Sequence, residues 1–190
     1  MAESLPEFLR SVRNALETAG VPYMLVGSVA SAAYGMIRAT QDIDIVIDPS
    51  PRSLDRLLAE FPTRDFHVSA AAAREALAKG GTFRIMPVDA LWKLDMIIRC
   101  MTPHGIEEFS RRRQMEIAGM EFDVATAEDT IIARLSWVAP GGSARQVDDV
   151  RGILAAQRGM LDEAYLARWI AVLELDELWK RSTDEFPPPE

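Results

Sequence analysis

Two aspartates alternate with isoleucines in the segment Asp42-Ile43-Asp44-Ile45-Val46-Ile47, and this pattern most constrains how the chain can fold. Successive side chains of a β-strand point to opposite faces, so Asp42 and Asp44 share one face and the three isoleucines share the other. The isoleucines predict a face that is buried in a core. The two carboxylates repel each other, and a divalent cation between them would offset that repulsion. Hard carboxylate oxygens favour Mg²⁺ or Mn²⁺, so the segment predicts a buried strand with a metal site on its other face.

A second motif lies upstream, where an apolar strand expected at 23–26 runs into Gly27-Ser28 and then into a helix expected at 29–34. Backbone N–H groups at such a strand-to-helix turn, together with the helix dipole, favour an anion such as phosphate. Gly27 lets the backbone approach a ligand closely, and the Ser28 hydroxyl adds a hydrogen-bond donor. The motif therefore predicts a phosphate-binding turn.

A third carboxylate, Asp95, lies within the apolar strand expected at 91–99, where a charge is costly to bury without a partner. Two interpretations are open. In the first, Asp95 joins Asp42 and Asp44 on a neighbouring strand, and the three carboxylates bind metal ions and activate an attacking hydroxyl, as in phosphoryl or nucleotidyl transfer. In the second, Asp95 forms a structural salt bridge with Lys93 or with an arginine.

Hydrophobic periodicity and stop signals predict an α/β (α+β) fold, in which a mixed sheet flanked by helices is followed by a helical C-terminal part. The expected helices are 7–19, 51–61, 70–79 and 106–113, the further strands are 82–86 and 91–99, and a hairpin over 114–125 turns at Ala118-Gly119. Thr126 with Asp129 is typical of a capping box, after which the chain is helical. We expect a domain at 1–125, a helical part at 126–183 and a disordered tail at 184–190. The four tryptophans are expected in the core or between helices.

Composition narrows the class of protein. The chain has 190 residues, 48% of them hydrophobic, and no apolar run long enough to span a bilayer or to act as a secretion signal, so a cytoplasmic location without membrane contact is expected. A formal net charge of −8 argues against a surface that binds nucleic acid broadly. The single Cys100 with two histidines offers neither an internal disulfide nor a zinc site.

The two motifs together carry a family resemblance. An apolar strand, Gly27-Ser28, a helix of small residues and Asp42-x-Asp44 resemble the signature of the nucleotidyltransferase superfamily typified by DNA polymerase beta. Within it, Gly35-x-x-Arg38-x-Thr40-x-Asp42-Ile43-Asp44 is similar to the AbiEii-type branch, which includes the toxins of type IV toxin–antitoxin systems. The C-terminal segments 128–137, 143–150 and 161–169 are also similar to that branch.

The resemblance implies a set of site residues. Mg²⁺ (or Mn²⁺) is expected at Asp42, Asp44 and Asp95, and the phosphates of a nucleoside triphosphate (NTP) at Gly27 and Ser28. A basic residue on the helix over 127–138, here Arg134, would contact the triphosphate, and an acid is expected at Asp149. Arg38 and Thr40 either join the nucleotide site or shape the loop before the aspartates. Relatives usually have lysine in place of Arg134, and a planar guanidinium does not reproduce the point charge of an ammonium.

These observations predict an enzyme that moves a nucleoside monophosphate from an NTP to an acceptor hydroxyl on tRNA, protein or a small molecule, with an antitoxin protein as a further possible partner. The alternative is a nucleotide-binding or partner-binding module that kept the fold and lost turnover. A haloacid-dehalogenase-type phosphatase needs an apolar strand that ends at its first aspartate, whereas Ala39-Thr40-Gln41 precedes Asp42. Metal-dependent glycosyltransferases do not require the upstream Gly-Ser turn, and the chain is short for one.

Overall fold

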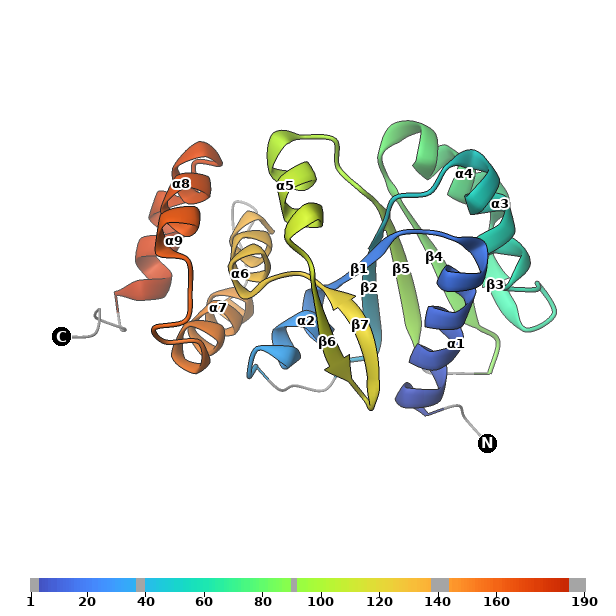
Figure 1. Ribbon diagram of the computed structural model, residues 1–190, viewed down its shortest axis with the longest axis horizontal. Coiled ribbons are helices and arrows are strands. Elements are labelled where there is room, and N and C mark those ends of the chain that lie inside the picture. The colour runs from blue at the N-terminus through green and yellow to red at the C-terminus, as the bar shows by residue number, and fades with distance from the viewer. Residues whose placement is uncertain (1–3, 37–39, 90–91, 138–143, 185–190) are drawn as a thin grey trace.

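The computed structural model describes residues 4–36, 40–89, 92–137 and 144–184. Its helices are α1 (Leu5–Ala19), α2 (Gly27–Ala33), α3 (Pro51–Ala59), α4 (Ala70–Lys79), α5 (Pro103–Arg111), α6 (Ala127–Ser136), α7 (Ala144–Ala156), α8 (Glu163–Val172) and α9 (Asp176–Thr183) (Figure 1). Its strands are β1 (Tyr23–Val26), β2 (Asp42–Ile47), β3 (Phe66–Val68), β4 (Thr82–Pro87), β5 (Lys93–Ile98), β6 (Arg113–Ile117) and β7 (Met120–Val124).

The strands form one mixed sheet in the order β3-β4-β5-β2-β1-β7-β6. β2 lies between β1, which is antiparallel to it, and β5, which is parallel to it. β1 also pairs in parallel with β7. The predicted α/β class, with a mixed sheet flanked by helices and a helical C-terminal part, is therefore confirmed.

One face of the sheet is buried as the alternation in β2 predicts. Ile43, Ile45 and Ile47 are all fully buried, and they pack in a core with apolar side chains of α1, α3 and α4. α1 contributes because its apolar residues recur at helical spacing, while Ser4 and Glu7 close its first turn as a capping box. Asp42 and Asp44 consequently lie on the opposite face, which is the face that can bind a ligand.

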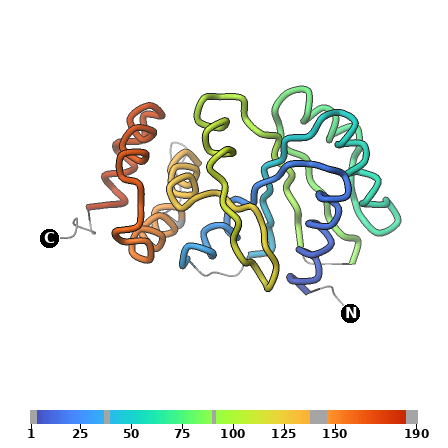
Figure 2. Tube along the Cα trace, in the orientation of Figure 1, coloured from blue at the N-terminus to red at the C-terminus, as the bar shows by residue number. Residues whose placement is uncertain are grey.

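The opposite face is covered in part by α5 and the C-terminal helices. Phe109 of α5 packs there against Met24, Val26 and Ala125. Helices α6 to α9 build a separate apolar core, joined to the sheet through Tyr34, whose hydroxyl donates to the Ala125 carbonyl at 2.8 Å. In the trace, α3 and α4 lie at one end of the molecule and α8 and α9 at the other (Figure 2). The expected division at residues 125 and 126 falls in the connection between β7 and α6.

Some element boundaries differ from the predictions. α2 begins at Gly27 rather than Val29, so the expected turn is the first turn of a helix. α5 begins at Pro103 rather than Ile106, because the Thr102 hydroxyl caps it by accepting from the Gly105 N–H at 3.2 Å. β3 was not predicted, since three residues are too few to show an alternating pattern. The hairpin turns at Ala118-Gly119 as predicted, both with positive φ.

The expected tail lies, from residue 185 onward, outside the described residues. Within the part of the chain that the structure describes, no helix is both long enough and apolar enough to span a bilayer.

Candidate functional site

The Asp44 carboxylate lies directly over the backbone of Gly27. A Cβ atom placed on Gly27 would fall 2.0 Å from Asp44 Oδ2 and 2.9 Å from Asp44 Cβ, and Gly27 also has a φ of +64°. Any side chain at residue 27 would therefore be strained and would displace the carboxylate. The register explains the approach, since Asp44 pairs with Val26, the last residue of β1. Glycine is therefore required at residue 27 so that the Gly27-Ser28 turn can lie against the aspartates of β2.

Asp44 also lies beside Asp95. The two residues are register partners on the parallel strands β2 and β5, so their side chains share the same face of the sheet. Burial raises the pKa of the Asp44 carboxyl, the negative charges of Asp95 and Asp42 raise it further, and Arg134 and Arg84 lower it. A cation that approaches Asp44 would therefore relieve both desolvation and repulsion.

Asp95 is held by Arg84, its register partner on β4. The guanidinium donates to both carboxylate oxygens, from Nε to Oδ1 and from Nη2 to Oδ2, each at 2.7 Å. Such a bidentate pair is among the stronger charge-assisted interactions, and it raises the pKa of Arg84 through that hydrogen bonding. Of the two interpretations of Asp95, the salt bridge with an arginine is thus present in the structure. The position of Asp95 beside Asp44 also agrees with the other.

Asp42 is more exposed, and Lys93 Nζ lies 3.8 Å from its Oδ1. Thr40 is not among the residues that line the cleft described below. Its hydroxyl donates to the Asp42 carbonyl at 3.0 Å and accepts from the Asp42 N–H at 3.2 Å. Thr40 therefore shapes the start of β2. Arg38 lies outside the described residues.

Arg134 joins three helices at the site. From α6 its Nε and Nη2 both donate to the Ser31 hydroxyl of α2, at 3.2 and 3.1 Å, and Nη2 lies 3.4 Å from the Ser28 hydroxyl. Its Nε is 3.4 Å from Oδ2 of Asp149, a buried carboxylate of α7. The structure thus brings Ser28, Arg134 and Asp149 together, next to Gly27.

A cleft of about 540 Å³ opens beside these residues. Gly27, Asp44 and Arg134 line it, together with Val46 and Ile97 of the sheet and residues of α5. Its volume is in the range of small-molecule and cofactor sites. Asp44 and Arg134 in one wall place a carboxylate and a guanidinium where a metal-bound phosphate could contact both.

The carboxylates fit a metal ion in part. Asp42 and Asp44 share a strand face and offer hard oxygens, but both oxygens of Asp95 are already bound by Arg84. Among the described residues, no three His, Cys, Asp or Glu side chains are gathered as a metal site. As the side chains lie, Asp44 and the more exposed Asp42, which has Lys93 Nζ 3.8 Å away, can accept a cation, whereas Asp95 is held by Arg84.

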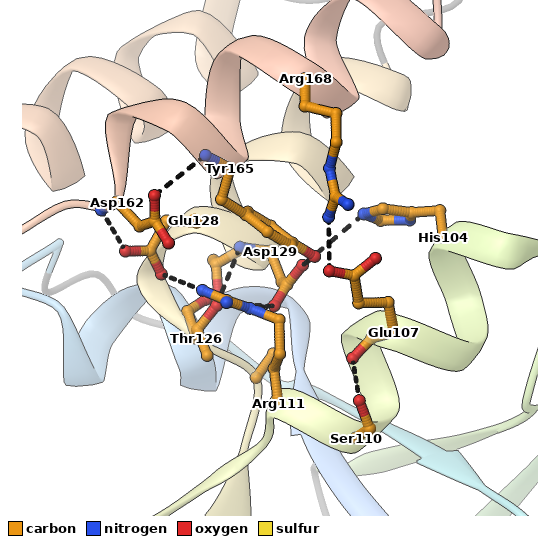
Figure 3. Close-up of polar contacts among 12 residues, drawn as sticks. His104, Glu107, Ser110, Arg111, Thr126, Glu128, Asp129, Asp162, Tyr165 and Arg168 are labelled. Carbon is orange, nitrogen blue, oxygen red and sulfur yellow. Dashed lines mark hydrogen bonds and ion pairs between the residues drawn. The ribbon is translucent and has the colours of Figure 1, made fainter.

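A buried ionic network holds α5 and α8 to the start of α6 (Figure 3). Asp129 accepts from the Tyr165 hydroxyl at 2.5 Å and from the Thr126 hydroxyl at 2.6 Å, and His104 and Arg111 each lie 3.6 Å from it. Burial alone would raise the pKa of Asp129, but the contacts with His104, Thr126 and Tyr165 lower it. The Thr126 cap forms as predicted, while the Asp129 side chain serves this network instead of completing a capping box. The network fixes the helix that carries Arg134.

Sequence reasoning did not predict Arg84, Glu108 or Trp137 in the site region, nor Ser31, which accepts from Arg134. Arg84 could have been suspected from its place between Phe83 and Ile85 in an alternating strand, which puts it on the face of Asp95. Glu108 lines the cleft from α5, and no sequence signal distinguishes it from Glu107. Trp137 also lines the cleft and is 70% exposed among the described residues, so the expectation that it lies in the core is wrong. It directly follows the last residue of α6.

Comparison with known proteins gives the fold. No family model matches the sequence. No curated protein matches it either. Among solved structures, ANT(2'')-Ia in complex with adenylyl-2''-tobramycin is similar with a TM-score of 0.61 and 16% identity, over 90% of this chain and 98% of that one.

Two further structures agree. The lincosamide antibiotic adenylyltransferase LnuA, with lincomycin bound, matches with a TM-score of 0.55 and 11% identity, over 78% of this chain and 95% of that one. An antigenic nucleotidyltransferase-like protein from Paracoccidioides brasiliensis matches with a TM-score of 0.50 and 16% identity, over 96% and 94%. At such identities the likeness concerns the fold alone, and the fold that this chain adopts is that of the nucleotidyltransferases.

Proposed function

We propose that the protein transfers a nucleoside monophosphate from an NTP to an acceptor hydroxyl and releases pyrophosphate. The observation that carries the proposal is the seating of the Asp44 carboxylate over Gly27, in the wall of a cleft that Arg134 also lines. A backbone turn, a carboxylate and a guanidinium so placed can hold a triphosphate together with its cation. The nucleotidyltransferase fold supports the same reaction class.

In the proposed reaction the acceptor oxygen attacks the α-phosphorus. A bond forms between that oxygen and phosphorus, the bond to the oxygen that bridges the α- and β-phosphorus atoms breaks, and pyrophosphate leaves with the electron pair. Asp42 and Asp44 would hold Mg²⁺ or Mn²⁺, which supplies neutralisation of phosphate charge when bound. Arg134 would orient the triphosphate. Asp95 would accept the hydroxyl proton, for which one of its oxygens must be released by Arg84.

A second candidate is a nucleotide-binding module without turnover, and the Arg84 pair is the observation that favours it. While Arg84 occupies both oxygens of Asp95, that carboxylate is a poor base and a poor metal ligand. Binding of NTP in the cleft would not require Asp95. The two candidates therefore differ in whether label is transferred, and agree in nucleotide binding.

The experiment combines binding with transfer. Isothermal titration of the chain with each NTP and Mg²⁺ should show binding that Asp44→Asn abolishes and Asp55→Asn preserves, since Asp55 pairs with Arg74 on the exposed surface of α3. Each α-labelled NTP is then incubated with the protein and cell extract, and the label is sorted into RNA, protein and small molecules. Binding without transfer would favour the module, and absence of Asp44-dependent binding would contradict both candidates.

The AbiEii-type resemblance adds a role in the cell to the proposal. The segment from Gly35 to Asp44 and the C-terminal helices support a toxin of a toxin–antitoxin pair, with an antitoxin protein as its partner. Induced expression should then arrest growth, and Asp44→Asn should remove the arrest. Unimpaired growth with the folded wild-type chain would contradict this role while leaving nucleotide transfer open to the titration above.

A further inference from the structure

Helix α5 contributes one wall of the cleft, and this wall carries a carboxylate that has no hydrogen-bond or ion-pair partner among the described residues. Glu108 lines the cleft and makes no hydrogen bond or ion pair with another described residue. The other charges of α5 are committed elsewhere. Glu107 pairs with Arg168 of α8, and Arg111 lies 3.6 Å from both Glu128 and Asp129. Consecutive glutamates on one helix thus have different surroundings, one in a surface ion pair and one facing the cleft.

Burial makes it costly in free energy for Glu108 to be ionised without a cation beside it. Burial raises the pKa of its carboxyl to about 7, the nearby charge of Asp129 adds to that rise, and His104 opposes it. A cation placed against this carboxylate would recover part of the desolvation cost. The fold is destabilised here at a point that lies in the cleft wall rather than in the core.

The two arginines in the described lining of the cleft lie against other carboxylates, and His104, which also lines it, lies 3.6 Å from Asp129. Arg99 donates toward Asp48 at 3.0 Å and lies over the Phe109 ring, and Arg134 lies against Asp149. Asp44 and Glu108 are the two carboxylates in the described lining of the cleft. Asp44 is expected to face the phosphates and their cation, so Glu108 remains for the other substrate.

The floor of the cleft beside these groups is apolar. Val46 and Ile97 are register partners on β2 and β5, two residues along from Asp44 and Asp95 and therefore on the same face of the sheet. A volume of about 540 Å³ suits a small molecule rather than a folded macromolecule. An acceptor that combines a compact carbon frame, hydroxyls and a positive charge would match this lining.

We propose that the α5 wall of the cleft is the acceptor site and that Glu108 binds the ammonium group of a small hydroxylated amine, whose hydroxyl receives the nucleotide. This rests on the proposed function for the reaction itself. Glu108 determines which acceptor binds and takes no part in the bond changes at phosphorus. Replacing its charge should therefore weaken acceptor binding and leave NTP binding unchanged.

The test uses α-labelled NTP and Mg²⁺ with a panel of hydroxylated primary amines, among them glucosamine and 2-deoxystreptamine, each beside its N-acetylated form. We expect label on an amine and little on its acetylated counterpart. Glu108→Gln should raise the KM for that amine by about tenfold or more, the size expected for loss of a charged hydrogen bond, with the KM for NTP unchanged. Glu107→Gln, one residue away in the surface ion pair, is the control and should behave as wild type.

Three outcomes overturn the inference while the proposed function stands: equal labelling of amines and acetylated forms, label found only on RNA or protein, and a Glu108→Gln variant with unchanged KM for the amine. Bound NTP with no labelled product also overturns it. Absence of NTP binding, measured by titration, would instead remove the proposed function. A Glu108→Gln variant that unfolds would be seen by circular dichroism, and Glu108→Asp, which keeps the charge, should then retain the preference for amines.

Discussion

Replacing Gly27 by alanine should damage the site far more than its single methyl group suggests. The φ of +64° would cost an alanine about 1–2 kcal/mol, as left-handed backbone does for any L-residue. The new Cβ would also lie 2.0 Å from Asp44 Oδ2, and rotating the carboxylate away would still leave Asp44 Cβ at 2.9 Å. The strand and the turn must therefore separate, an overpacking cost of about 1–3 kcal/mol. We expect Gly27→Ala to lower the free energy of unfolding by about 3 kcal/mol.

Gly119→Ala is the matched control, because Gly119 has a φ of +78° and a Cβ atom added to it would meet nothing within 4 Å. Urea denaturation followed by circular dichroism should give it the backbone cost alone, about 1–2 kcal/mol, with normal NTP binding by titration. Gly27→Ala should lose NTP binding by about tenfold or more as Asp44 is displaced. If the two variants have equal stability and equal affinity, the close approach of Asp44 to Gly27 is not what makes this glycine necessary.

Three further perturbations test other parts of the structure. Tyr165→Phe removes the hydroxyl that donates to buried Asp129 and should cost about 1.5–3 kcal/mol in urea denaturation, more than Tyr34→Phe, whose hydroxyl donates to a neutral carbonyl; equal costs would contradict a charged acceptor. Arg134→Ala leaves Asp149 buried without that guanidinium and should cost about 3 kcal/mol, whereas Arg134→Lys should lose less stability; the reverse order would contradict the ion pair. Burial raises the pKa of the Glu108 carboxyl from 4.5 in the unfolded chain to about 7 in the folded protein, so between these pH values the native state binds a proton that the unfolded state has lost. The contribution of Glu108 to the free energy of unfolding is therefore complete below pH 4.5 and falls by up to about 3 kcal/mol as the pH rises through 7. Glu108→Gln should flatten this pH profile, as urea denaturation at several pH values would show.

The sequence predicts those parts of the site that depend on local geometry. Alternation in β2 is sufficient to put Asp42 and Asp44 on one face and the isoleucines on the other, because the side-chain period of a strand admits no other arrangement. The sequence also predicts a need for glycine at residue 27, as the place where the backbone approaches a ligand. In the structure the group that approaches Gly27 is the carboxylate of Asp44.

The parts that depend on register or on the rotation of a helix could not be predicted in the same way. Arg84 meets Asp95 because β4 pairs with β5 in one particular register, and a shift of one residue would send the guanidinium to the other face. Glu107 and Glu108 are adjacent and chemically alike, so only the packing of α5 on the sheet decides which of them faces the cleft. Trp137 differs from the other tryptophans because it lies just past the end of its helix.

The charges around β2 indicate where an incoming cation gains most. Asp42 lies near Lys93, Asp95 is bound by Arg84, and Asp149 lies against Arg134. Asp44, more buried than Asp42, has no such ion pair within the described residues, and burial with two neighbouring carboxylates raises its pKa. A cation brought in with a triphosphate would therefore be stabilised most strongly at Asp44, the carboxylate that Gly27 admits to the cleft wall. Asp42, Asp95 and Asp149 each already have a cation beside them, so a cation brought in with the nucleotide would gain less free energy at those carboxylates. Nucleotide binding should therefore depend on Asp44 more than on Asp42 or Asp95.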